Sequence, residues 1–245
     1  MDHPDLAQSA WRSLAAFQRL IGQHAPDAEV LEHDAFVASR VPATHSSLIN
    51  AAVSRPTGIA DHLDEIERFY HGQPKWGVWI DPARTEDAEA LRSRGLVLDS
   101  TPVLMGAELD DVDHAPDRQV VRVTLDEVGV VNDAAYDLPA GTISDPVTSL
   151  PANELHAYGI RELKEAMSVG VVQDVGSDAF VTFVATLPAN RGEHLASRIL
   201  AHALHEAHER GQTTTTLQAS KLGQSLYARL GYRPLGEIHL YEKRR

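Results

Sequence analysis

VATLPANRGEHLA, residues 184–196, is the stretch of sequence that decides the fold. It joins two predicted elements. Residues 179–187 are apolar and β-branched, which predicts a buried strand, and from Gly192 to Arg210 apolar residues recur at helical spacing. The first N–H groups of a helix have no intrahelical partner and carry partial positive charge, so this junction predicts an anion site. Arg191 adds a cation there. Pro188 lacks an N–H, which helps to end strand pairing and lets neighbouring strands splay.

A second informative stretch is LQASKLGQSLYARLGYRPLG, residues 217–236. A strand rich in β-branched threonines is expected to end at Ser220, which is polar. Gly223 follows three places later and Tyr227 seven places later, on a predicted helix. A Leu-Gly-Tyr turn at residues 230–232 then closes that helix.

Together the two stretches resemble the signatures of the GNAT N-acetyltransferase superfamily, over roughly residues 120–243. The family's pyrophosphate loop reads Arg/Gln, two residues, Gly, one residue, Gly/Ala; here Arg191 takes the first place and Ala196 the last. His194 stands where the family has its middle glycine, and Ser220 stands where an asparagine is usual. The motifs lie in the family's order, with strand–loop–helix–strand–helix between them.

The resemblance implies acetyl-CoA as the co-substrate, with no metal. The backbone of Val184, Ala185 and Thr186 would pair with the pantetheine arm, and an amide near Val184 would polarise the acetyl carbonyl. Tyr227 would be the catalytic group that protonates the departing CoA thiolate. The expected cofactor-binding residues are Val184, Ala185, Thr186, Arg191, Gly192, Glu193, His194, Leu195, Ala196 and Ser220.

Three interpretations of His194 are open. In the first, its side chain crowds the phosphates, because glycine is used where the backbone must approach a ligand closely. In the second its ring donates to a phosphate, and in the third the cofactor has been lost.

The function that the resemblance implies is transfer of the acetyl group of acetyl-CoA to a primary amine of a small molecule, by direct attack in a ternary complex. The rival hypothesis is a non-catalytic CoA-binding or interaction module.

The predicted elements occur in a similar order in the two parts of the chain, which indicates a duplication. We expect an α/β protein (α+β, mixed sheet) with two GNAT-like halves, each a twisted mixed sheet flanked by helices. Residues 1–115 form the degenerate copy, since the junction AAVSRPTGIADHL at residues 51–63 has no phosphate-loop pattern, and residues 116–245 form the acetyltransferase domain. The acidic stretch ELDDVDHAPDRQ, residues 108–119, is the expected linker. Two such halves can imitate a dimer of single-copy relatives, so the chain is a monomer or a homodimer.

The periodicity places each element. Helices are expected over residues 8–21, 59–70, 85–94, 126–136, 192–210 and 222–230, and strands over 29–31, 36–40, 48–53, 75–80, 102–108, 120–125, 154–161, 166–174, 179–187, 213–219 and 232–241. Residues 139–153, rich in Pro, Gly, Ser and Asn, are expected to form a loop with one helical turn.

The composition excludes several classes of protein. There is no cysteine, so disulfides, cysteine nucleophiles and thiolate metal sites are absent. The formal net charge of −13 disfavours nucleic acid as a partner. No apolar run is long enough for a bilayer, and the N-terminus reads as an amphipathic helix instead of a signal peptide. We therefore expect a cytoplasmic protein with no membrane partner.

Other chemically suggestive residues receive plainer interpretations. No general base is identified: Asp174, Asp178 and His156 lie near strand ends, and water can relay the proton instead. The histidines at 202, 205 and 208 drift around their helix, so a solvated face is favoured over a metal site. Trp76 and Trp79 are expected on one face of their short strand, where core or inter-half packing is favoured over an aromatic cage.

Overall fold

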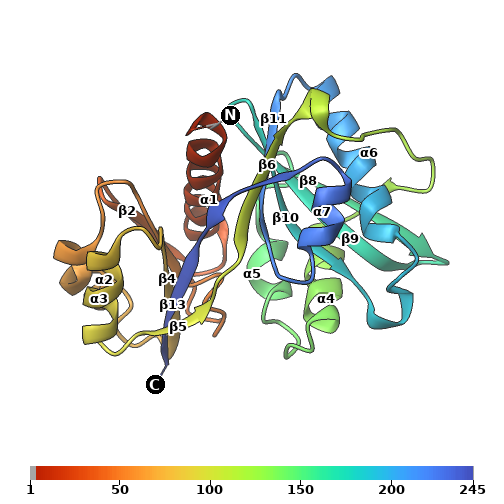
Figure 1. Cartoon of the computed structure of the whole chain (residues 1–245). Helices are drawn as coiled ribbons and strands as arrows, with labels where there is room; N and C mark the ends of the chain where they lie inside the picture. The colour runs from red at the N-terminus through yellow and green to blue at the C-terminus, as the bar shows by residue number, and fades with distance from the viewer. Residues whose placement is uncertain (1–3, 245) are drawn as a thin grey trace.

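The structure is a computed structural model that describes residues 4–244. Its strands form two mixed sheets (Figure 1). The first sheet has the order β1-β2-β3-β4-β13-β5 and consists of β1 (Glu29–His33), β2 (Phe36–Arg40), β3 (Ala51–Ser54), β4 (Lys75–Ile80), β13 (His239–Arg244) and β5 (Val97–Ser100). The second has the order β12-β6-β11-β10-β9-β8-β7 and consists of β12 (Arg233–Glu237), β6 (Val103–Glu108), β11 (Thr214–Ala219), β10 (Asp178–Thr186), β9 (Glu165–Val175), β8 (Leu155–Glu162) and β7 (Val121–Arg122).

Each half of the chain gives one strand to the sheet of the other half. β6, from the first half, lies between β11 and β12, while β13, from the end of the second half, lies between β4 and β5. All four of these contacts are antiparallel. A boundary at residue 115 therefore does not separate the two sheets, because each sheet needs a strand from the other side of it.

The helices cover both faces of each sheet. They are α1 (Pro4–His24), α2 (Leu63–Phe69), α3 (Thr85–Ser93), α4 (Leu125–Ala135), α5 (Ser144–Thr148), α6 (Leu195–Glu209) and α7 (Gln224–Arg229), with single 3-10 turns at Ala60–His62, Leu109–Asp111 and Pro188–Asn190. In Figure 1, α2 and α3 lie outside the first sheet, and α6 lies on the outer face of the second.

Helix α1 stands between the two sheets and joins them (Figure 1). Its buried face, with Leu14, Phe17 and Ile21, belongs to one continuous apolar cluster that includes Val53 of the first sheet and Phe180 of the second. The Ser13 hydroxyl also donates to a buried Asp178 carboxylate oxygen at 2.6 Å. One shared core of this size binds the halves together, since burial of apolar surface is the main stabilising term in folding.

Strand β10 leaves its parallel partner β11 halfway along its length. The two strands pair from Asp178 with Thr214 to Val181 with Leu217, and no pairing follows. On its other edge, the register of β10 against β9 shifts between Thr182 and Ala185, and Phe183 within that bulge has φ 49°. A bulge bends and twists a strand, so it turns the second half of β10 away from β11. The sequence predicted a splay caused by Pro188; the strands do splay, but they separate already after Val181, at the bulge.

Three sequence-based expectations need correction. The single strand expected over residues 232–241 is two strands in different sheets, because Gly236, with φ 144°, and Ile238 redirect the chain. The strand β5 was not anticipated, because it is only four residues long and its residues, Val97 and Leu98 included, are largely exposed. The long helix starts at Leu195 instead of Gly192, which has φ 88°.

The two tryptophans of β4 point to opposite faces, so the expectation of a shared face was wrong. They are three residues apart, and side chains of a strand alternate with a period of two. Trp76 packs in the outer cluster and stacks on Tyr70, with ring centroids 4.7 Å apart. Trp79 packs in the shared core against α1.

The expected linker, residues 108–119, packs against the second half. Leu109 and Val112 are buried, and the N–H of Asp113 donates to the carbonyl of Leu230 at 3.0 Å. Arg198 of α6 forms two hydrogen bonds with the Asp117 carboxylate, at 2.7 and 3.0 Å.

Within residues 4–244, no helix combines the length and apolar character needed to cross a bilayer.

The exchanged strand β13 makes a testable contribution to stability. Leu240 is 0% exposed and belongs to the shared core, so Leu240→Ala should lower the free energy of unfolding by about 2–5 kcal/mol. The matched control is Leu222→Ala: Leu222 is 94% exposed, and the change should stay within about 0.5 kcal/mol. Urea unfolding of both variants measures the difference, and equal small effects would mean that β13 does not hold the core.

Candidate functional site

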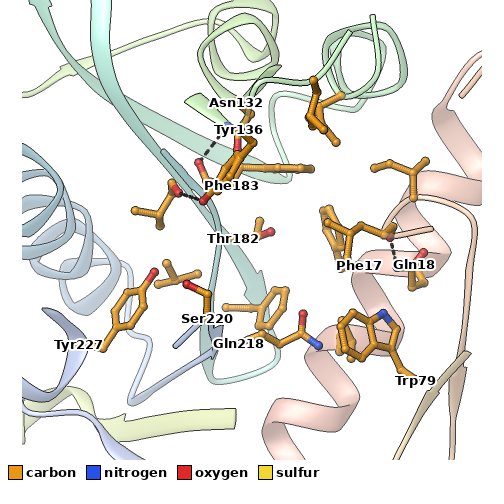
Figure 2. Close-up of a pocket in the computed structure, with 18 residues that line it drawn as sticks. Phe17, Gln18, Trp79, Asn132, Tyr136, Thr182, Phe183, Gln218, Ser220 and Tyr227 are labelled. Atoms are coloured by element: carbon orange, nitrogen blue, oxygen red, sulfur yellow. Dashed lines mark hydrogen bonds between the residues drawn. The ribbon is translucent and has the colours of Figure 1, made fainter. Parts of the chain in front are cut away.

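The splay between β10 and β11 opens into a pocket of about 430 Å³ (Figure 2). Both halves of the chain line it. α1 and β4 contribute Phe17, Gln18 and Trp79 on one side, and the ends of β11 and α7 contribute Ser220 and Tyr227 on the other. Thr182 and Phe183 of the β10 bulge lie in the middle of the view in Figure 2. The pocket therefore meets the part of β10 that has lost its strand partner.

Three carbonyl groups in the splayed part of β10 accept hydrogen bonds from side chains. The Asn132 amide donates to the Phe183 carbonyl at 3.3 Å, and the Tyr136 hydroxyl donates to the Val184 carbonyl at 3.1 Å. The Ser168 hydroxyl donates to the carbonyl of Ala185. A ligand arm that paired with this edge at Val184 would have to take the place of the Tyr136 hydroxyl, whose side chain is among the exposed large ones.

The loop between β10 and α6 presents a run of unpaired N–H groups. Within residues 4–244, none of the backbone N–H groups from Gly192 to Ser197 donates to a carbonyl or to a side chain, and the first helical bond runs from Arg198 to the carbonyl of His194. These donors sit at the positive end of the 15-residue helix α6. The sequence-predicted residues Glu193, Leu195 and Ala196 thus lie in an arrangement suited to an anion.

The structure explains why the family pattern has a glycine at the position of His194. His194 is the N-cap of α6 and has φ 60° and ψ 18°, in the left-handed region. Glycine reaches that region without cost, while a side chain there costs about 1–2 kcal/mol. Its side chain is exposed and makes no capping hydrogen bond. The feature that distinguishes this position is its backbone conformation.

Arg191 reaches toward the end of α4. Its guanidinium donates to the carbonyl of Ala135 at 2.7 Å and, more weakly, to that of Thr186 at 3.4 Å. The Ala135 carbonyl lies in the last turn of α4, where a cation is favourable. In this conformation Arg191 ties the loop to α4, and its positive charge remains beside the loop.

Tyr227 lies on α7 and faces the pocket (Figure 2). Its hydroxyl makes no hydrogen bond with any residue of the described range. Burial raises the pKa of the Tyr227 phenol well above its ordinary value, and the nearby Tyr136 raises it further. The phenol is therefore neutral at any ordinary pH, and it can donate a proton.

Packing explains the glycines in the second informative stretch, residues 217–236. A Cβ at Gly223 would lie 3.0 Å from the Tyr227 ring, so a side chain there would press on the ring. A Cβ at Gly231, which has φ 103°, would lie 2.6 Å from the carbonyl oxygen of Asp111. Ser220 is exposed, lines the pocket and accepts the N–H of Gly223 at 3.3 Å, so it also caps the turn that starts α7.

None of the three residues weighed as a general base lines the pocket. Asp174 binds Arg210 with two hydrogen bonds, at 2.7 and 2.9 Å, and lies 3.3 Å from the His156 ring nitrogen. Burial alone would raise the pKa of Asp174, but these partners hold it well below its usual range. Burial raises the pKa of Asp178, which accepts hydrogen bonds from Ser13 and Thr216.

The histidines of α6 pair with carboxylates. His202 lies 3.0 Å from Glu206, and His208 lies 3.1 Å from Asp110. Among the described residues, one other group of possible metal ligands has its donor atoms within 4.8 Å of each other: His33, His62 and Glu65. The Nδ1 atom of His33 accepts the Ala35 N–H at 3.0 Å, so the neutral ring carries its proton on Nε2 and has no free lone pair to offer an ion.

Most of the pocket residues were not foreseen from the sequence, among them Phe17, Gln18, Asn132 and Tyr136. Helix α1 was identified by its apolar period, but a buried position gives no sign of which cavity it borders. Asn132 and Tyr136, spaced by four on α4, did carry a signal. Polar groups at this spacing on an otherwise apolar face need partners, which here are the carbonyls of β10.

The comparisons with known proteins agree with this geometry. Residues 167–235 match the family model described as acetyltransferase (GNAT) domain, which covers the region from β9 to β12. None of the curated proteins gives a significant match to the sequence. The family match supports an acyl-CoA-dependent acyltransferase, as the sequence predicted.

Several solved structures share the fold. A GCN5-related N-acetyltransferase from Kribbella flavida is 19% identical with a TM-score of 0.66, and the match covers 96% of this chain and 95% of that one. A putative acetyltransferase of the GNAT family from Novosphingobium aromaticivorans is 18% identical with a TM-score of 0.63, covering 98% of both chains. A tandem GNAT protein from the clavulanic acid biosynthesis pathway is 13% identical with a TM-score of 0.55, covering 98% of this chain and 95% of that one. At these identities the likeness shows the fold.

The backbone conformation at His194 predicts a reversal of the usual order of alanine and glycine. His194→Gly should be more stable than His194→Ala by about 1 kcal/mol, because only glycine is relaxed at φ 60°. At His205, inside the same helix, alanine should be more stable than glycine by about 1 kcal/mol. Urea unfolding of the four variants provides the comparison. The same order at both positions would show that residue 194 is not left-handed in solution.

Proposed function

We propose that this chain transfers the acetyl group of acetyl-CoA to a primary amine of a small molecule, by direct attack of the amine on the bound thioester. The observation that carries the proposal is the run of unpaired N–H groups from Gly192 to Ser197, placed at the end of a strand that has lost its partner. The first feature suits a pyrophosphate and the second an extended arm that leads into the pocket. The family match over residues 167–235 supports the same assignment.

The residues then divide the chemistry between them. The N–H groups of Gly192 to Ala196 would hold the pyrophosphate, with the charge of Arg191 beside them. The arm would run along Val184–Thr186, and an amide near Val184 would stabilise the oxyanion that forms on the acetyl carbonyl. As the carbon–sulfur bond breaks, the Tyr227 hydroxyl would give its proton to the thiolate.

The exchanged strands favour a monomer with a degenerate first half. β6 and β13 give each sheet a strand that a single half would otherwise have to obtain from a second copy. The first half has no phosphate-loop pattern at its junction of residues 51–63, yet it provides one wall of the pocket through α1 and β4. In this proposal the first half shapes the acceptor site, and the second half binds acetyl-CoA.

A carboxylate at the first turn of α6 should separate binding from stability. Ala196→Glu places a negative charge where the helix dipole favours it, so the free energy of unfolding should be unchanged or rise by about 0.3–1 kcal/mol. The same charge repels a pyrophosphate, so the affinity for acetyl-CoA should fall at least about tenfold. Calorimetric titration with acetyl-CoA measures the affinity.

The matched control for this variant is Ala90→Glu on α3, which makes the same change in net charge in the first half. It should leave the affinity within about twofold of the wild type. If Ala196→Glu and the wild type bound acetyl-CoA with equal affinity, the pyrophosphate would not bind at this loop. No binding of acetyl-CoA by the wild type would reject the proposed function altogether.

Removal of the Tyr227 hydroxyl should slow turnover without weakening cofactor binding. Tyr227→Phe should lower kcat by a factor of about 10²–10⁴, the usual contribution of a general acid, and leave the acetyl-CoA affinity unchanged. Because the pKa of Tyr227 is raised, ionisation of this group should not lower the wild-type rate between pH 8 and 10. Tyr232→Phe is the control, since that buried hydroxyl pairs with Thr215 at 2.7 Å. An unchanged kcat in Tyr227→Phe would remove the acid role.

A further inference from the structure

The pocket beyond the splayed strands has an unusual chemical composition for a site that would receive an amine. Of the 18 residues that line it, none is Asp, Glu, Lys, Arg or His. Aromatic rings form much of the wall, from Phe17, Trp79, Phe180 and Phe183. A site for a polycation or an amino acid needs opposite charges to replace the lost hydration, because burying an unpaired charge is costly.

The entrance to the pocket is apolar as well. Leu48, Tyr136 and Leu138 all line the pocket, and they are 51%, 59% and 37% exposed. Exposed apolar side chains are ordinary when they are scattered, but a group of them around one opening marks a binding site. Tyr136 and Leu138 directly follow α4, and Leu48 comes from the segment before β3, so two distant parts of the chain contribute to this opening.

Two carboxylates that are close to pocket residues in the sequence are engaged elsewhere. Asp133 follows Asn132 on α4, but its oxygens accept the N–H groups of Ile143 and Ser144 at 2.8 and 3.2 Å. Asp178 is held by Ser13 and Thr216, as described above. The neighbouring groove shares Leu48 and Leu138 with the pocket; there Asp99 pairs with Arg244, and the exposed Asp145 lines the groove but not the pocket.

From these observations we propose that the acceptor is a small monoamine with an uncharged aromatic or branched aliphatic body, which enters the pocket through the apolar opening at Leu48 and Leu138. The proposal rests on the proposed acetyl transfer and names the substrate class of that same site. Aromatic walls suit a flat apolar body of this size, and large apolar contacts dominate the affinity of such pockets.

The neutral pocket also accounts for the lack of a general base. Desolvation disfavours the charged form of an amine, so its pKa falls inside the pocket and the free amine predominates. The lone pair of the free amine attacks the acetyl carbon, a nitrogen–carbon bond forms, and the carbon–sulfur bond breaks with its electron pair going to sulfur. The thiolate takes the Tyr227 proton, the new amide loses one proton to water, and the phenol regains one from solvent.

Gln218 is the polar group placed to orient that amine. It lies on β11 where the strands splay, and Figure 2 shows its amide facing the pocket interior, between Ser220 and Trp79 in that view. Neither polar atom of this amide forms a hydrogen bond with a residue of the described range, so the oxygen is free to accept and the buried Nε2 is free to donate. The amide oxygen can accept an N–H of the amine, which leaves the lone pair free to attack. Gln218 is thus a positioning residue.

The test uses the whole chain and four amines: phenethylamine, 3-methylbutylamine, 1,4-diaminobutane and phenylalanine. CoA release and the mass of the acetylated product give kcat/KM for each. The first two amines should exceed the last two by at least about 100-fold, because the latter carry a second charge that this pocket cannot pair. A preference for the diamine or for phenylalanine, with acetyl-CoA bound, would overturn the acceptor class and leave the acetyl transfer standing.

Two variants test the mechanism of selection. Leu48→Glu should shift the ratio of kcat/KM for phenethylamine to kcat/KM for the diamine by at least about tenfold toward the diamine. The control is Val130→Glu, at a residue that is 53% exposed and outside the pocket, and it should leave this ratio unchanged. Gln218→Leu, similar in size, should lower kcat/KM for phenethylamine about tenfold and leave the affinity for acetyl-CoA within twofold. Unchanged ratios in Leu48→Glu would overturn the proposed entrance, and an unchanged kcat/KM in Gln218→Leu would remove its positioning role.

The remaining outcomes separate the two proposals. If acetyl-CoA does not bind by calorimetry, the proposed function fails and the acceptor class fails with it. If acetyl-CoA binds but none of the four amines is acetylated, the acceptor class is wrong and the non-catalytic hypothesis gains.

Discussion

The separation of β10 from β11 after Val181 and Leu217 is the constraint on which the rest of the site depends. Two parallel strands that stay paired leave no room between them for a ligand. Here the bulge at Phe183 bends β10 away, and the next residues lead into the loop that starts α6. One local departure from regular pairing therefore creates the pocket, and the same strand leads into the loop that starts a long helix.

The gap would collapse without support from the surrounding elements. Asn132 and Tyr136 of α4 bind the carbonyls that β11 leaves without a strand, since buried polar groups must find partners. Helix α1 closes the other side, and its Phe17 packs edge-on against Phe183, with centroids 5.4 Å apart. The first half is therefore part of the site although it has no phosphate-binding loop.

The exchange of β6 and β13 fixes the first half in that position. Each exchanged strand is hydrogen-bonded on both edges, so moving one half would break pairing in both sheets. Such an arrangement holds the walls of the pocket, which come from distant parts of the sequence, in one geometry. Pre-organisation of this kind lowers the cost of ordering a site when it binds a ligand.

The strength of the sequence signal differs between these features. The apolar period of α6, the β-branched run of β10 and the spacing from Ser220 to Tyr227 were enough to predict the strand–loop–helix unit and its anion-binding end. Local features of this kind follow from patterns within a few turns of chain, because hydrophobic period and backbone hydrogen bonding are local properties. The glycine pattern even marked residue 194 as exceptional, although the reason, its left-handed backbone, required the structure.

The tertiary structure alone decided which residues meet. The faces of Trp76 and Trp79, the division of residues 232–241 between two sheets and the place of α1 beside Phe183 all depend on contacts between residues far apart in the chain. The sequence by itself determined the elements and the loop that suits an anion, because those depend on neighbours along the chain. Only the tertiary structure decided that the pocket is neutral and aromatic, because its walls come from strands and helices that pack together after the local structure has formed.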